Sequence, residues 1–201
     1  AGAPLAHGEM INNGAGPMSW RGAIEKAKQI PFEELRQSEQ GEVLLLREPV
    51  GTVLAILTYN GPIVLMGMKV IPALLAGCPV IIKPAPESPL TTRIISEAIA
   101  EADFPPGTLS MLAAGLDVTQ HLVSHDGVAM ISLTGGTAIA IDVIQRSSPR
   151  LARTALELGG KSPALIADDS NLDQILPDLV GGSTGFQGQV GLNLARILVR
   201  R

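Results

Sequence analysis

Cysteine and aromatic residues are scarce in this chain, which has one cysteine, Cys78, and 2% aromatic residues in 201. A single cysteine excludes an intrachain disulfide and gives no sign of an oxidising compartment, so a cytoplasmic location is expected. Charged residues reach only 17%, with 15 basic against 19 acidic residues and a net charge of −4. No broad basic surface can form, which argues against nucleic acid as a partner.

The sequence has one long run without charge, Pro49–Met68, that invites comparison with a membrane span. The triplet Asn60-Gly61-Pro62 stands in its middle, and such a triplet is typical of a turn. This run is therefore expected to form a strand, a turn and a helix instead of a membrane span. A membrane is not expected as a partner. The opening AGAPLAHGEM also lacks the basic-then-apolar order of a signal peptide.

Hydrophobic residues make up 46% of the chain, with 22 glycines and 15 prolines, which suits an α/β protein with many tight turns. Five short apolar runs predict strands at Val50–Leu57, Pro79–Ile82, Thr108–Leu112, Val128–Leu133 and Thr154–Leu158. Helical patterns lie between them, at Pro62–Ala76, Leu90–Ala102, Val118–Ser124 and from about Thr137 to Gln145. This alternation predicts a Rossmann-like five-stranded parallel sheet with helices on both faces.

Four segments are expected along the chain. Residues 1–41 form a lead-in that is loosely ordered up to about residue 20, with a short helix within Trp20–Gln37 that is broken at Pro31. Residues 42–48 form a strand with charged ends, and residues 49–159 a dinucleotide-binding domain. In residues 160–201 the carboxylates Asp168, Asp169 and Asp173 open a helix to about Val180, and Ala195–Val199 is a strand without neighbours.

Polar or glycine-rich residues follow three of the predicted strands, at Thr58–Gly61, Lys83-Pro84 and Thr134–Gly136. Ligands of open parallel sheets bind at such carboxyl ends, and glycines at a helix N-terminus let the backbone approach a pyrophosphate. The G-x-G-x-x-G fingerprint is absent, and a Gly-Gly pair is also ordinary turn chemistry. Spacing alone leaves Lys83 open between a ribose or phosphate ligand and a solvated surface lysine.

The sequence LELGGKSP at Leu156–Pro163 is a highly specific motif. Six shorter motifs accompany it: Arg47–Gly51, Asn60-x-Pro62, Pro72–Gly77, Lys83–Ala85, Pro105–Gly107 and Thr134-Gly135. Through these motifs, in family order and at family spacing, the chain from about Glu42 onward resembles the NAD(P)-dependent aldehyde dehydrogenase family. The resemblance implies oxidation of an aldehyde to a carboxylic acid, with a small-molecule aldehyde as substrate and NAD or NADP as cofactor.

In that family a cysteine thiolate attacks the aldehyde, hydride leaves to the nicotinamide, and a glutamate activates water to hydrolyse the thioester. By resemblance, Asn60 donates to the oxyanion and Glu157 is the general base. The positions that would contact the cofactor are Thr58, Tyr59, Lys83, Pro86, Leu133, Gly135, Gly136 and Leu158.

The nucleophile position departs from the family. Its pattern, close to N-x-G-Q-x-C, matches Phe186–Gly191, and Gly188 and Gln189 place Gly191 where the cysteine belongs. Loss of a covalent nucleophile costs on the order of 10⁶ in rate, so catalysis by this chain is expected to be impaired. Cys78 precedes the second strand, far from that end of the sheet, and is expected to be a small buried residue.

Two smaller features bear on cofactor and metal. Pro86 stands where NAD-preferring members often carry a glutamate that binds the adenosine ribose, so NADP is expected beside NAD. His121 and His125 are four residues apart, but no third ligand is spaced near them, so no metal site is expected.

In the family, the catalytic domain continues well beyond the position that matches residue 201. Residues 160–201 are therefore expected to be a truncated start of that domain. The truncation is either natural, or the sequence is part of a longer chain. Seven apolar residues would then lack packing partners: Ile175, Leu176, Leu179, Leu192, Leu194, Ile197 and Leu198. Besides an impaired oxidoreductase, two functions stay open: a non-catalytic NAD(P)-binding module, and an interaction partner that forms a homo-oligomer or joins a longer relative.

Overall fold

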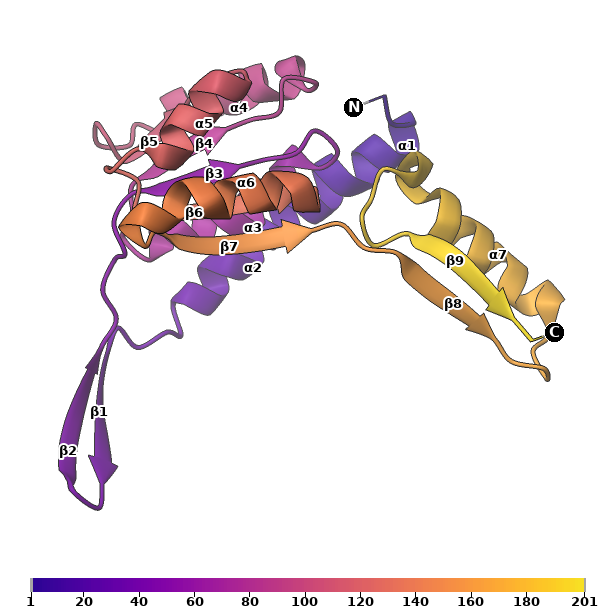
Figure 1. Ribbon diagram of the computed structural model, residues 1–201, viewed down its shortest axis with the longest axis horizontal. Helices are drawn as coiled ribbons and strands as arrows, with labels where there is room; N and C mark the ends of the chain where they lie inside the picture. The colour runs from indigo at the N-terminus through magenta and orange to yellow at the C-terminus, as the bar shows by residue number, and fades with distance from the viewer. Residues whose placement is uncertain (1, 201) are drawn as a thin grey trace.

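A five-stranded parallel sheet forms the centre of the molecule in the computed structural model, which describes residues 2–200 (Figure 1). Its strands are β3 (Val53–Ile56), β4 (Val80–Lys83), β5 (Leu109–Met111), β6 (Met130–Gly135) and β7 (Arg153–Leu158). The order is β5-β4-β3-β6-β7, and every neighbouring pair is parallel. The predicted five-stranded parallel sheet is confirmed.

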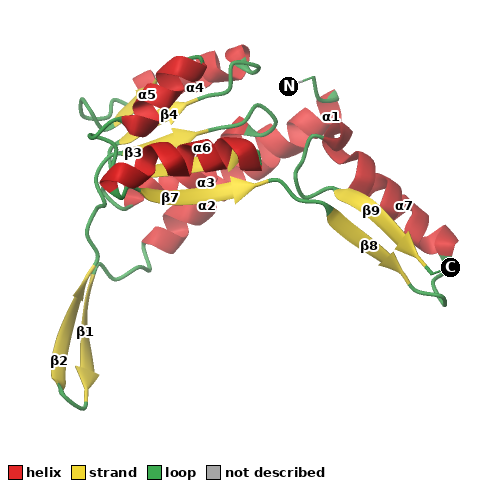
Figure 2. Ribbon diagram, viewed as in Figure 1, coloured by secondary structure: helices red, strands yellow, loops and turns green. Residues whose placement is uncertain are grey.

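Helices cover both faces of this sheet because alternate residues of β3 point to opposite sides. The helices are α3 (Pro62–Leu75), α4 (Pro89–Glu101), α5 (Leu116–Ser124) and α6 (Thr137–Ser147), followed by a 3₁₀ turn at Ser148–Arg150 (Figure 2). Val53 and Ala55 join a core with residues of α3 and α4. Leu54 and Ile56 join a second core with residues of α5 and α6.

The strand order reverses between β3 and β6, so the connections from these neighbours run to opposite sides of the sheet. A crevice forms at such a point outside the carboxyl ends of the strands. Helix α3 begins there at Pro62, whose fixed backbone suits a first helical position. It ends before Gly77, which has a φ of 78° that favours glycine, as expected from the sequence.

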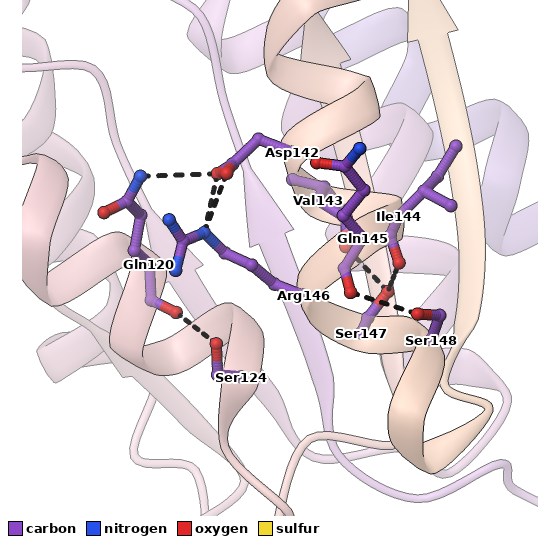
Figure 3. A network of polar contacts seen from close by, with 9 residues as sticks. All are labelled: Gln120, Ser124, Asp142, Val143, Ile144, Gln145, Arg146, Ser147 and Ser148. Atoms are coloured by element: carbon purple, nitrogen blue, oxygen red, sulfur yellow. Dashed lines mark hydrogen bonds and ion pairs between the residues drawn. The ribbon is translucent and has the colours of Figure 1, made fainter.

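Polar side chains tie α5 to α6 on the outer surface (Figure 3). The Nε of Arg146 donates to both carboxylate oxygens of Asp142 at 2.9 Å, one turn away on α6. The amide of Gln120 on α5 donates to the same carboxylate. Arg146, with Gln120 adding to its effect, lowers the pKa of Asp142 below its usual value.

The expectation of a loosely ordered start is wrong. The N-terminal region is helical, with α1 (Leu5–Gly8), a π-helical segment (Glu9–Ala15) and α2 (Gly16–Ala27). Helix α2 packs on α3, where a Cβ on Gly67 would lie 2.1 Å from Ser19 Oγ, so only glycine permits this approach. The indole of Trp20 donates to the Ile63 carbonyl at 2.7 Å. These contacts join segments that are distant in the sequence, so the weak local pattern of residues 1–20 did not predict the helices.

The expected strand at residues 42–48 is present as β2 (Gly41–Leu46), and it pairs antiparallel with β1 (Glu33–Ser38). The prediction missed β1, whose sequence EELRQS is almost entirely polar. Figure 1 shows this hairpin extending away from the sheet. Its apolar residues stay exposed, among them Leu35, Val43 and Leu44.

The C-terminal region forms a small unit beyond β7, made of β8 (Ser162–Ile166), α7 (Leu172–Thr184), a 3₁₀ segment (Gly185–Gly188) and β9 (Leu194–Val199) (Figure 1). The expectation of a strand without neighbours is wrong, because β9 pairs in parallel with β8. Asn171 caps α7, so only Asp173 of the three carboxylates lies in its first turn. The expected exposure is confirmed for Leu176, Leu192, Ile197 and Leu198.

Within residues 2–200, no helix is both long enough and apolar enough to cross a membrane.

The contribution of the buried residues of β3 to stability can be tested by mutation. Leu54 is fully buried in the core on the α5 and α6 side. Leu54→Ala leaves a cavity there and is expected to lower the free energy of unfolding by about 3 kcal/mol in urea denaturation. The matched change Leu90→Ala, at a residue 69% exposed on α4, is expected to cost less than about 0.5 kcal/mol. An equal loss of unfolding free energy in the two variants would contradict the placement of Leu54 in the core.

Candidate active site

A cavity of about 510 Å³ opens at the carboxyl ends of β3, β6 and β7. The sequence-predicted residues that line it are Thr58, Asn60, Glu157, Leu158 and Gly191. Residues 58–60 follow β3, residues 157 and 158 end β7, and Gly191 arrives from the loop before β9. The structure thus brings together three segments that are 97 and 34 residues apart along the chain.

The side chain of Asn60 is held at both ends. Its Oδ1 accepts a hydrogen bond from Thr58 Oγ1, and its Nδ2 donates to the Gln189 carbonyl, both at 2.5 Å. The two bonds fix which end of the amide donates, and they leave the second Nδ2 hydrogen for a ligand. They also connect the end of β3 to the loop that carries Gly191.

Gly191 lies in the turn between Val190 and Asn193, whose N–H donates to the Val190 carbonyl at 3.0 Å. Among residues 2–200 the Gly191 N–H has no acceptor. A Cβ built on Gly191 would lie 3.5 Å from Gly159 Cα, an ordinary contact. The position therefore has room for a side chain and a free N–H, but it carries no nucleophile.

Cys78 is remote from this arrangement. It is buried among core residues of β3, α3 and β4, including Val53 and Val70, and does not line the cavity. The expectation of a small buried residue is confirmed.

Lys69 is a charged residue near the site, outside the lining of the cavity, that the prediction missed. It lies on α3, is 94% buried, and its Nζ donates to Ser132 Oγ on β6 at 3.2 Å. Burial lowers the pKa of its ammonium, and the nearby Glu157 carboxylate opposes that shift. A signal was present in the sequence, because Lys69 is the one charged residue between Val50 and Ile82.

Much of the cavity lining is apolar, and part of it comes from the N-terminal region. Its apolar lining consists of Ile11, Ala15, Val64, Leu65, Met68, Phe186, Val190 and Leu192. Phe186 is 95% buried and stacks on His7 with 6.1 Å between ring centroids. The sequence did not predict these residues as cavity walls. For Ile11 and Ala15 no periodicity marks the N-terminal segment, which lines the cavity only because the chain folds over the strand ends.

A second cavity, of about 320 Å³, lies after β4 and β5. Its lining includes Pro84, Pro86, Ala113 and Gly115. Lys83 ends β4 just before this cavity and is half-buried. Burial lowers the pKa of Lys83, and Glu87 opposes that shift. This environment differs from that of a freely solvated surface lysine.

Helix α6 begins just after the end of β6, directly after Gly135 and Gly136. Gly136 is its N-cap and supplies no side-chain hydrogen bond, so the first N–H groups of this 11-residue helix are free for an anion. A Cβ on Gly136 would meet nothing within 4 Å, so a ligand has open access. Thr134 Oγ1 is buried without a partner among the described residues, in the wall of the first cavity.

The remaining predicted cofactor positions differ in exposure. Tyr59 is 36% exposed and Leu158 is 42% exposed at the strand ends, whereas Leu133 is 99% buried in the core beneath them.

Within residues 2–200 no cluster of three metal-ligating side chains occurs. The rings of His121 and His125 lie edge to face with 5.7 Å between their centroids, and Nδ1 of His125 accepts a hydrogen bond from the Gly127 N–H at 3.0 Å.

These features, a dinucleotide-type crevice beside an amide, a carboxylate and a turn carrying Gly191, agree with one family. The family model described as "Aldehyde dehydrogenase family" matches residues 1–201. The chain belongs to the aldehyde dehydrogenase family.

Similar proteins include geranial dehydrogenase of Castellaniella defragrans, 38% identical over 173 residues that cover 86% of this chain and 36% of that protein. A solved aldehyde dehydrogenase of Mycobacterium tuberculosis, complexed with NAD⁺, is 36% identical with a TM-score of 0.93, and the match covers 100% of this chain and 41% of that one. The chain thus spans about two fifths or less of these relatives.

A third similar protein is a mutant of aldehyde dehydrogenase C from Pseudomonas syringae, with one cysteine replaced by alanine, solved with NAD⁺ and octanal. It is 28% identical with a TM-score of 0.91, over 100% of this chain and 41% of that one.

The buried Lys69 predicts a specific pH dependence. Because its pKa in the folded chain lies below the ordinary value of 10.5, the unfolded chain holds more protons between these values, and stability rises with pH there. Lys69→Met is expected to remove this rise, measured as the free energy of unfolding in urea from about pH 8 to about pH 10. The exposed Lys26→Met is the control and should keep it. A rise of equal size in Lys69→Met would contradict the assignment.

Proposed function

We propose that this chain forms the cofactor-binding part of an NAD(P)-dependent aldehyde dehydrogenase site in which the nucleophile is missing, so that it binds NAD(P) without covalent aldehyde oxidation. The observation that carries the proposal is the convergence of Asn60, Glu157 and Gly191 on one cavity. Asn60 supports the role of oxyanion donor and Glu157 that of general base, whereas Gly191 has only hydrogen where the family has a thiol.

The residues at the carboxyl edge fit a dinucleotide. The free N–H groups at the start of α6, reached over Gly135 and Gly136, suit the pyrophosphate. Lys83, half-buried after β4, suits the adenosine ribose, with the second cavity beside Pro86 for the adenosine. Thr134 Oγ1 offers an unused buried hydroxyl in the first cavity, near Thr58, where the nicotinamide end would lie. A bound NAD(P) would supply the hydride acceptor.

For an aldehyde in the first cavity, the second N–H of Asn60 and the N–H of Gly191 can both donate to the carbonyl oxygen. Glu157 can accept a proton from water. No atom of residue 191 can form a bond to the carbonyl carbon, so the covalent step has no nucleophile. A relative with one cysteine changed to alanine has been solved with both NAD⁺ and octanal, which supports binding of both ligands when that cysteine is absent.

Pro86 supports binding of NADP as well as NAD. It lines the second cavity and, unlike a glutamate at the same position, adds no carboxylate that would repel a 2′-phosphate. The single, buried Cys78 supports a reducing compartment such as the cytoplasm.

Calorimetry with each cofactor tests the proposal. NAD⁺ and NADP⁺ are expected to bind with comparable affinity, and Lys83→Ala is expected to weaken binding about tenfold by removing one charge-assisted hydrogen bond. Lys26→Ala, on the exposed side of α2, is the matched control and should bind as the wild type does. Wild-type protein with NAD⁺ and an aldehyde should form no NADH.

Absence of binding at millimolar cofactor would contradict the cofactor site. Wild-type affinity in Lys83→Ala would remove Lys83 from it, and NADH formation by the wild type would contradict the missing nucleophile.

The hairpin favours association as a second function, with another copy or with a longer relative. Its strands β1 and β2 pair only with each other, so both outer edges are open among the described residues. Leu35 and Leu44 face each other in register and are 59% and 57% exposed. An apolar edge of this kind is suited to pairing with a partner chain.

Sedimentation velocity tests the association. The wild type is expected to sediment as an oligomer, and Leu44→Asp is expected to shift it toward monomer because a charge replaces the apolar contact. Gln40→Asp, in the turn of the same hairpin, controls for added charge. A wild type that is wholly monomeric would contradict this function.

A further inference from the structure

A third cavity, of about 630 Å³, lies in a groove between α2 and α3. Its apolar lining comes from both helices and from the segment that follows α2, and it includes Ala23, Ala27, Ile30, Phe32, Pro72 and Leu75. The volume lies within the range of about 300–1,000 Å³ that is usual for small-molecule sites. Among the described residues, this groove and the first cavity share only Met68 in their linings, so the groove is a site of its own.

Small residues of α2 leave the groove open. A Cβ built on Gly22 would meet nothing within 4 Å, so no neighbouring side chain fills the space beside this residue. Ala23 and Ala27, one turn apart, contribute only methyl groups to the same lining. Phe32 is 44% exposed and Met68 is 57% exposed, although both line the groove. Apolar side chains that stay accessible around a cavity are suited to an apolar ligand.

The charges around the groove favour an anion. Its charged lining residues are Lys26, Arg47 and Glu48, two cations against one carboxylate, whereas the chain as a whole has a net charge of −4. Lys26 forms no ion pair within residues 2–200. The guanidinium of Arg47 is held in place, because Nη1 donates to the Pro31 carbonyl and Nη2 lies 3.4 Å from a Glu34 carboxylate oxygen. A guanidinium has five N–H donors, so Arg47 keeps donors for a ligand.

We propose that this groove binds an aliphatic carboxylate, with the alkyl chain between α2 and α3 and the carboxylate at Lys26 and Arg47. An apolar volume with two cations in its lining matches a ligand that has an alkyl chain and one anionic end. A small molecule is favoured over a macromolecule because α2, α3 and the segments around Phe32 and Arg47 surround a volume of small-molecule size. The proposal goes beyond the proposed function, since it requires neither NAD(P) nor the residues of the candidate active site.

Calorimetry with decanoate tests the ligand class. Decanoate is expected to bind to the wild type at submillimolar concentration. Octanoate, which is two CH₂ groups shorter, is expected to bind about tenfold more weakly, because each buried CH₂ adds to the affinity. 1-Octanol is expected to bind about tenfold more weakly than octanoate, because it makes no charge-assisted hydrogen bond. Absence of decanoate binding at millimolar concentration, or equal affinity for octanoate and 1-octanol, would overturn the proposal.

Two variants of α2 test the location. Ala23→Phe fills the groove and is expected to weaken decanoate binding about tenfold or more. Gln29→Phe adds the same ring at an exposed residue outside the lining and should bind as the wild type does. Lys26→Ala is expected to weaken binding about tenfold by removing one charged donor, whereas Lys28→Ala, at a lysine paired with exposed Glu25, should not. Wild-type affinity in Ala23→Phe or in Lys26→Ala would overturn the proposal. Thermal unfolding of each variant separates loss of the site from loss of the fold.

Calorimetry with NAD⁺ on the same variants separates this site from the cofactor site. Lys26→Ala is expected to lose decanoate affinity and keep wild-type affinity for NAD⁺, and Lys83→Ala is expected to do the opposite. Decanoate binding with this variant pattern, but without NAD⁺ binding, supports the groove and overturns the cofactor site. A decanoate affinity that falls as the protein concentration rises would mean that a second copy of the chain occupies the groove, and would overturn the proposal.

Discussion

The Asn60 side chain is the interaction on which the site depends, because it connects the end of β3 to the loop before β9. Thr58 and Gln189 hold its amide from two sides. The bond to Gln189 brings Gly191 to the cavity that Glu157 enters from β7. Without this connection the parallel sheet would still offer a crevice for a dinucleotide, but the segment that carries Gly191 would lose its direct bond to the end of β3 and keep only its other contacts, such as the stacking of Phe186 on His7.

Much of the fold could be predicted, because continuous apolar runs such as that around Leu54 and stops such as Gly77 are local signals. The sheet strands and the helices between them lie within a few residues of their expected places. Strand β1 was missed because Glu33 and Arg36 belong to an exposed hairpin without an apolar pattern. The helical structure before Trp20 was missed because its stability comes from contact with α3, as at Gly67, whereas the short helix expected within Trp20–Gln37 overlaps α2.

The candidate site was predicted through motif order, and the structure brings Asn60, Glu157 and Gly191 to one cavity. Lys69 was missed although it is the only charge in a long apolar stretch, because its partner Ser132 is 63 residues away in the sequence. Phe186 and Ile11 were missed for the same reason: contacts between distant segments make them cavity walls. Local patterns identify strand ends well, whereas the walls of a cavity depend on the complete fold.

The most direct test of the account is a crystal structure of this chain with NAD⁺. We expect the pyrophosphate at the N-terminus of α6, the adenosine beside Lys83, and the nicotinamide in the cavity of Asn60 and Glu157, facing the backbone of Gly191. A cofactor bound elsewhere, or the sulfur of Cys78 in contact with the Asn60 amide, would contradict it.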